Sequence, residues 1–137
     1  MQEINKAKFE KDGAVLIENV LNQDEIEVLR KVAYETIKKD EEKDSFFLHR
    51  HAKNHLGCLT DIPEFKKLIL DDRVIKIAET LLGGTPVFFG DSIMEIGIGN
   101  RGFHKDTANR TDPNHPDWTE DYPIIRIAFY LEDHSKH

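Results

Sequence analysis

The sequence has 137 residues, with 19 Lys and Arg against 26 Asp and Glu and a formal net charge of −7. A chain of this length forms one domain or part of one, and its acidity argues against nucleic acid as a partner, because phosphate binding needs clustered basic side chains. No apolar run reaches the ~18–20 residues that span a bilayer, and the N-terminus lacks a signal-peptide core. With a single cysteine, Cys58, no intramolecular disulfide can form, so we expect a soluble cytoplasmic protein.

The chain opens with predicted helices. Residues 3–12 form a short amphipathic helix that Gly13 ends, since glycine adopts the left-handed conformation at little cost. Ala14–Val20 is apolar and β-branched, which predicts a strand. Asn22 and Glu25 have the spacing of a capping box, and apolar residues at intervals of three and four predict a helix from there to about residue 39.

Two more helices, and one candidate strand before them, are expected ahead of the strand-like C-terminal half. Ser45–His51 is a candidate strand. Asp61 is the expected cap of a helix that has Pro63 in its first turn. Asp71 or Asp72 is the expected cap of the next helix, which the glycine pair after Leu82 ends.

The remaining segments are strand-like. Val87–Phe89, Ser92–Ile98 and Ile124–Leu131 are apolar and β-branched, with turn signals between them. Helices followed by strands indicate an α+β protein or a sheet sandwich wrapped by N-terminal helices. A long apolar strand at the end of the chain normally has a further partner, so the sheet looks unfinished.

The segment Gly102–Asp106 carries the sharpest chemical feature. His104 and Asp106 are two residues apart, so on an extended segment both side chains point the same way. An imidazole and a carboxylate so placed can bind one metal ion, and with a distant histidine they make the facial triad of non-haem Fe(II) oxygenases. A His-x-Asp pattern also arises by chance, so an ordinary loop pair is the alternative.

The order of motifs resembles the phytanoyl-CoA dioxygenase family of Fe(II)- and 2-oxoglutarate-dependent oxygenases. Phe9–Ile17 is similar to the family's opening helix and first strand, and Asn22–Arg30 to its following helix. Val74–Phe89 resembles the helix-to-strand passage before the metal motif. His104 and Asp106 stand at the motif itself, and Ile124–His134 resembles the strand after it.

This resemblance implies a mainly β or α+β double-stranded β-helix (jelly roll) with N-terminal helices. His104 and Asp106 would be catalytic iron ligands, and Met94, Lys105 and Phe129 would lie next to the co-substrate 2-oxoglutarate. The implied reaction hydroxylates a small-molecule substrate while 2-oxoglutarate is decarboxylated to succinate.

The chain departs from the family pattern near its end. The family's distal histidine ligand and its carboxylate-binding arginine lie beyond the last strand; neither His134 nor His137 matches that ligand, and Arg126 is on the wrong strand. We therefore expect residues 1–137 to be a single domain, the truncated N-terminal portion of a jelly roll, that self-associates through an exposed sheet edge. A non-catalytic binding module is the alternative function.

Other features support weaker interpretations. His49, His51 and His55 form an imidazole cluster that is read as a polar surface, a pocket lining or a zinc or nickel site. Arg50 and Lys53 are the basic candidates for a substrate pocket.

The last features give mostly structural expectations. Trp118 is expected to pack under the long polar loop Thr107–Tyr122 rather than to stack on a substrate, and Cys58 to be a small buried hydrophobe. The Gly-x-Gly-x-x-Gly pattern that begins at Gly97 is not read as a dinucleotide site, because no helix follows it.

Overall fold

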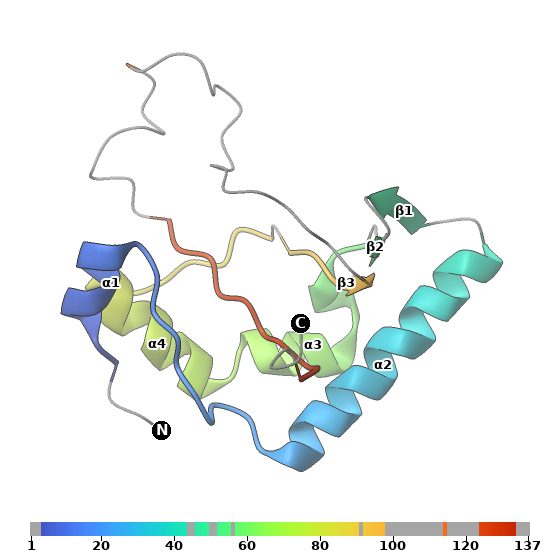
Figure 1. The fold of residues 1–137 in the computed structure, drawn as a ribbon, viewed down its shortest axis with the longest axis horizontal. Coiled ribbons are helices and arrows are strands. Elements are labelled where there is room, and N and C mark those ends of the chain that lie inside the picture. The colour runs from blue at the N-terminus through green and yellow to red at the C-terminus, as the bar shows by residue number, and fades with distance from the viewer. Residues whose placement is uncertain are drawn as a thin grey trace.

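The computed structural model describes residues 4–43, 46–49, 52–55, 57–90, 92–97, 114 and 124–133 (Figure 1). These residues form four α-helices, one 3-10 helix (η1) and three strands. In chain order the elements are α1 (Lys6–Asp12), α2 (Gln23–Glu42), β1 (Phe46–His49), β2 (Ala52–His55), η1 (Leu59–Asp61), α3 (Pro63–Ile69), α4 (Asp72–Leu82) and β3 (Glu95–Gly97). Among them, no helix is long and apolar enough to span a membrane.

α1 ends and α2 begins as the sequence predicts, although α1 starts at Lys6, later than predicted. Gly13 ends α1 in the left-handed conformation, with φ of 75°. At the start of α2, the side-chain oxygen of Asn22 accepts a hydrogen bond of 2.9 Å from the Glu25 amide, and the Glu25 carboxylate accepts one of 2.8 Å from the Asn22 amide. The capping box is therefore confirmed, and α2 ends at Glu42, beyond the expected end near residue 39.

The next two helices confirm one predicted cap and correct the other. Asp71 caps α4 by accepting a hydrogen bond of 2.9 Å from the Arg73 amide, and Gly83 ends that helix with φ of 74°. The prediction that Asp61 caps α3 was wrong, since Asp61 is the last residue of η1 and Ile62 holds the cap position without a side-chain hydrogen bond. The cause is local: hydrogen bonds over three residues, such as the one from the Asp61 amide to the Cys58 carbonyl, commit Asp61 to a 3-10 turn.

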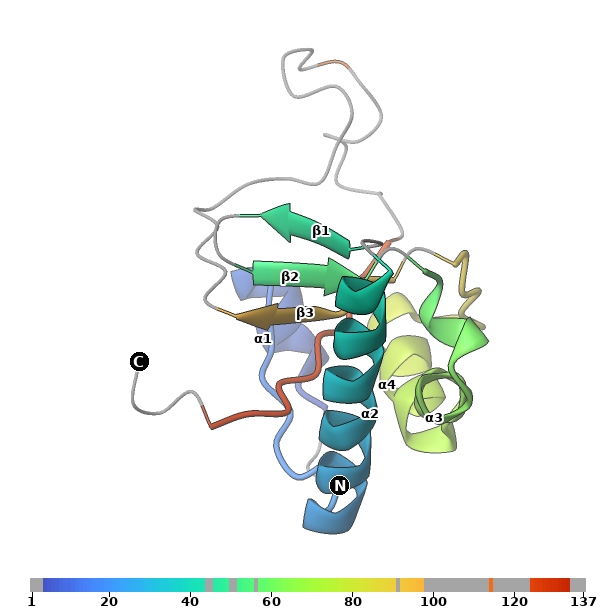
Figure 2. The same cartoon turned by 90° about the vertical axis from the view of Figure 1, so that its right-hand side faces the viewer.

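The sheet is small and antiparallel. Its strand order is β1-β2-β3, with Leu48 opposite Lys53 and Lys53 opposite Ile96. β1 falls inside the predicted strand at residues 45–51, and β3 inside the one at residues 92–98. Figure 2 shows the three strands with α2 running across them, and α2 packs against all three.

The core lies between this sheet and the helices. Leu29, Ala33 and Ile37 recur every four residues along α2 and are at most 5% exposed, so they form one buried helix face. Buried residues of η1, α3, α4 and the segment just before β3 meet that face: Leu59, Phe65, Leu68, Val74 and Met94. The predicted apolar face of α2 is therefore the centre of the core.

Three predicted strands are not strands in the described structure. Ala14–Val20, Val87–Phe89 and Ile124–Leu131 join no hydrogen-bonded ladder of described residues, so these predictions were wrong as stated. Exposed and half-buried residues nevertheless alternate along residues 124–131, as in an extended segment that packs one side on a core. The described part is a mixed α+β arrangement, and within it no closed jelly roll is seen.

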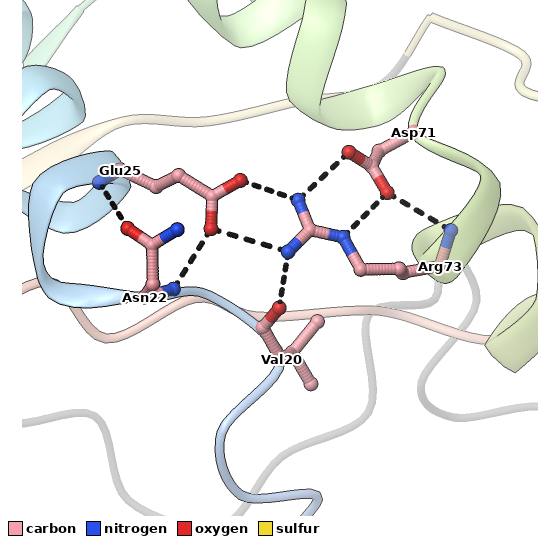
Figure 3. Close-up of polar contacts among 5 residues, drawn as sticks. All are labelled: Val20, Asn22, Glu25, Asp71 and Arg73. Atoms are coloured by element: carbon pink, nitrogen blue, oxygen red, sulfur yellow. Dashed lines mark hydrogen bonds and ion pairs between the residues drawn. The ribbon is translucent and has the colours of Figure 1, made fainter. Parts of the chain in front are cut away.

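Arg73 joins α4 to the N-terminal part of the chain (Figure 3). Its guanidinium donates to both carboxylate oxygens of Glu25, at 2.6 and 3.1 Å, and to both of Asp71, at 2.8 and 2.9 Å. A fifth bond of 2.7 Å reaches the carbonyl oxygen of Val20. The hydrogen bonds from Arg73 to the two carboxylates lower the pKa of Asp71 to about 2 and also lower the pKa of Glu25. Arg73 thereby fixes α4 to the capping box of α2.

Candidate functional site

The three residues of the predicted iron motif, His104, Lys105 and Asp106, lie outside the described residues. The same is true of Arg50, His51, Trp118, His134 and His137. Among the described residues, no group of three or more His, Cys, Asp or Glu is arranged to hold a metal ion. The candidate site is therefore built from the two segments that flank the motif in the chain, β3 before it and residues 124–133 after it.

The flank before the motif is held by β2. In register, Asn54 lies opposite Glu95 and Lys53 opposite Ile96, and the His55 amide donates a hydrogen bond of 3.0 Å to the Met94 carbonyl oxygen. Met94, the first predicted neighbour of 2-oxoglutarate, is 7% exposed and belongs to the hydrophobic core. Its proposed contact with 2-oxoglutarate stays a prediction.

The flank after the motif is held by α2. Ile127, Phe129 and Leu131 are half-buried and pack against the same core as Ile96. Phe129, the other described residue predicted to lie near 2-oxoglutarate, thus packs its side chain against the helical core, and its contact with 2-oxoglutarate also stays a prediction. Both flanks rest on one helical layer, so the chain on either side of the motif is anchored to a common support.

Arg30 of α2 supplies polar contacts to the second flank. Its guanidinium donates two hydrogen bonds, of 2.9 and 2.8 Å, to the Leu131 carbonyl oxygen and lies 3.3 Å from the Glu132 carboxylate. The Tyr34 hydroxyl lies 3.3 Å from that same carboxylate. Arg126, on the same segment, is exposed.

The sheet has two chemically different faces. Lys53 and His55 both reach α2, where Lys53 pairs with Glu41 and His55 with Asp40. Because side chains alternate along a strand, Asn54 lies on the face away from α2, together with its register partner Glu95. Asn54 is 3% exposed. The basic pocket candidate Lys53 is therefore on the helix side of the sheet.

The histidine cluster is divided in the structure. His55 Nδ1 lies 2.6 Å from Asp40 Oδ2, and the two side chains are only 14% and 13% exposed. His49 pairs in register with Ala52, whereas His55 pairs with Phe46, so the two histidines lie at opposite ends of the hairpin ladder. Sequence reasoning missed Asp40 because nothing local in the sequence links the end of α2 to β2.

Cys58 lies in a polar setting rather than the apolar one that the sequence suggests. It is half-buried, its Sγ is 3.0 Å from the Thr60 hydroxyl oxygen, and the hydrogen bond from Thr60 lowers the pKa of the thiol. The neighbouring Leu59 amide donates a hydrogen bond of 3.1 Å to the Ser92 hydroxyl, which joins the start of η1 to the approach of β3.

The family model described as phytanoyl-CoA dioxygenase (PhyH) matches residues 9–136 and so includes both flanks and the motif between them. No curated protein and no solved structure matches the chain.

Proposed function

The chain belongs to the phytanoyl-CoA dioxygenase family, and from this premise we propose that it acts as an Fe(II)- and 2-oxoglutarate-dependent dioxygenase on a small-molecule substrate. Members of the family are dioxygenases that generally use Fe(II) and 2-oxoglutarate. The reaction that we propose hydroxylates the substrate and decarboxylates 2-oxoglutarate to succinate.

His104 and Asp106 are the proposed iron ligands. An imidazole nitrogen and a carboxylate oxygen are two of the three donors that non-haem Fe(II) sites use, so these residue types fit the metal. When bound, the iron would supply the activation of O2 that protein side chains cannot perform. Lys105, Met94 and Phe129 are the proposed neighbours of 2-oxoglutarate.

The observation that carries the proposal is the family match over residues 9–136, within which the His-x-Asp motif lies between two anchored segments. Residues that bind a metal are positioned more precisely when rigid elements support the chain that carries them. The core that packs Ile96 and Phe129, and the bonds from Arg30 to Leu131, give the chain on both sides of the motif such a support.

An anaerobic titration with Fe(II), with and without 2-oxoglutarate, tests the proposal. We expect a visible charge-transfer band that requires 2-oxoglutarate and that His104→Ala removes. His49→Ala, in a histidine of the hairpin instead of the motif, is the matched control and should keep the band.

The other outcomes are equally informative. A band lost in His49→Ala but kept in His104→Ala would place the metal in the histidine cluster and overturn the assignment of the ligands. If the folded chain gives no band, the proposal fails for this polypeptide, and a non-catalytic binding module becomes the better description.

A further inference from the structure

A groove of about 460 Å³ lies between α2 and the sheet. Its α2 wall consists of residues three or four apart, which share one face of the helix. The residues that line the groove are Tyr34, Ile37, Lys38 and Glu41 of α2, and Lys53, Ile96 and Gly97 of the sheet. A volume of this size falls within the ~300–1,000 Å³ range of small-molecule sites.

The groove combines an apolar base with a charged rim. Ile37 is 4% exposed and belongs to the core, and Ile96 packs against that core from β3. Gly97 adds no side chain at the end of β3, so it leaves this side of the groove open. A ligand here would meet apolar atoms at its base and polar atoms at its edge.

The lining charges favour an anion. Two lysines and one glutamate give 2 − 1 = +1 in the groove, whereas the whole chain carries −7. The Lys53 ammonium is already paired with the Glu41 carboxylate. Among the described residues, none forms an ion pair with Lys38, so its ammonium is the lining charge that we assign to a ligand.

We propose that this groove binds a small amphipathic monocarboxylate, with its carboxylate on the Lys38 ammonium and its apolar body over Ile37 and Ile96. One uncompensated positive charge matches a monoanion better than a dianion or a cation. None of the residues that line the groove is a proposed iron ligand or a proposed neighbour of 2-oxoglutarate, so this binding goes beyond the proposed oxygenase activity.

The test is a titration of the isotope-labelled chain with 4-phenylbutyrate, followed by amide NMR shifts and calorimetry. We expect a Kd on the order of 1 mM, as for a ligand of this size in an open site. The shifts should cluster at residues 34–41, 53 and 96–97, which contain the groove lining. The uncharged isostere 4-phenylbutanamide should bind more weakly.

Two variants separate the Lys38 contact from overall charge. Lys38→Gln should weaken binding by about threefold, the usual effect of losing one exposed ion pair. Lys39→Gln makes the same charge change at the adjacent residue of α2, which does not line the groove, and should leave the Kd unchanged. Circular dichroism confirms that both variants fold.

Several results overturn the proposal. These are the absence of shifts at about ten times the expected Kd, equal affinity for the amide, equal loss in the two lysine variants, or shifts that cluster away from the groove. Because the titration contains no iron, its failure leaves the oxygenase proposal untouched, and a missing iron band leaves this one untouched.

Discussion

Arg30 and Leu131 are 101 residues apart in the chain, and one guanidinium donates two hydrogen bonds to one carbonyl oxygen to join them. The contact closes the segment after the His-x-Asp motif onto α2, the helix that also packs against β1, β2 and β3. A charged donor that binds a main-chain oxygen holds the backbone itself, so the contact does not depend on the side chain at residue 131.

Replacing Arg30 should loosen this tether. We expect Arg30→Gln to lower the free energy of unfolding by about 1–3 kcal/mol, since two charge-assisted hydrogen bonds to a partly buried carbonyl are lost. Urea unfolding measures the change. Lys31→Gln, at an exposed residue with a 3.9 Å contact to Glu35, is the control and should stay within about 0.5 kcal/mol of the wild type. Equal losses in both variants would show that the tether contributes nothing.

The Arg73 network should make stability depend on acid pH. The guanidinium lowers the pKa of Asp71 from 3.8 to about 2, so the folded state favours the ionised carboxylate. This contribution is fully present above pH ~4 and is lost as the pH falls through about 2, and it amounts to about 2 kcal/mol. Asp71→Asn keeps a capping oxygen but cannot ionise.

We therefore expect Asp71→Asn to be less stable than the wild type at pH 7, with the gap closing toward pH 2. Denaturant unfolding at a series of pH values measures the two curves. A gap that stays constant with pH would mean that the carboxylate charge of Asp71 is not what stabilises the fold.

Gly57 leaves room for the His55 side chain. A Cβ atom at residue 57 would lie 2.4 Å from His55 Nε2 and 2.9 Å from its Cε1. The ring cannot simply swing away, because Asp40 holds Nδ1 at 2.6 Å. We expect Gly57→Ala to cost about 1–3 kcal/mol of stability through loss of the Asp40–His55 hydrogen bond.

A double-mutant cycle checks that cause. In a His55→Ala background the ring is absent, so Gly57→Ala should become nearly neutral. If the cost of Gly57→Ala is the same in both backgrounds, the glycine is needed for its backbone and not for the space that His55 occupies.

The expected self-association can be argued from the exposed apolar side chains. Leu16, Val87, Phe89 and Tyr130 are each more than 60% exposed, and they lie on segments that join no ladder of described residues. Such surfaces favour association, so we propose that the chain forms oligomers whose size rises with concentration. Sedimentation velocity measures this, and Val87→Asp should shift the distribution toward monomer. A monomer at every concentration would contradict the proposal.

Local signals in the sequence predicted the helices well. The Asn22–Glu25 capping box and the glycines that end α1 and α4 act over three or four residues, so the sequence displays them directly. The prediction that Asp61 caps α3 was wrong because aspartate is common both at helix caps and in tight turns. The hydrogen bond from the Asp61 amide to the Cys58 carbonyl, three residues earlier, places Asp61 in the 3-10 turn instead.

Contacts between residues far apart in the chain could not be predicted from such local signals. Whether Ile124–Leu131 forms a strand depends on a hydrogen-bonding partner elsewhere in the chain. An alternating apolar pattern does not indicate which segment that partner is. For the same reason, the sequence did not predict the pairing of Asp40 with His55 or of Glu25 with Arg73, because these partners are 15 and 48 residues apart. The His104–Asp106 site is proposed from its two-residue spacing and from the order of segments around it, and it stays a prediction because both residues lie outside the described ones.

The contact between Arg30 and Leu131 also has a kinetic consequence. The Asn22–Glu25 capping box closes over three residues, so α2 can form early in folding, whereas the tether joins residues 101 apart in the chain and has a larger entropic cost of closure. We expect the tether to be absent from the folding transition state. Loss of the Arg30 bonds should then accelerate unfolding and leave the folding rate almost unchanged. Under this expectation, residues 124–133 dock on α2 only after the folding transition state has been crossed.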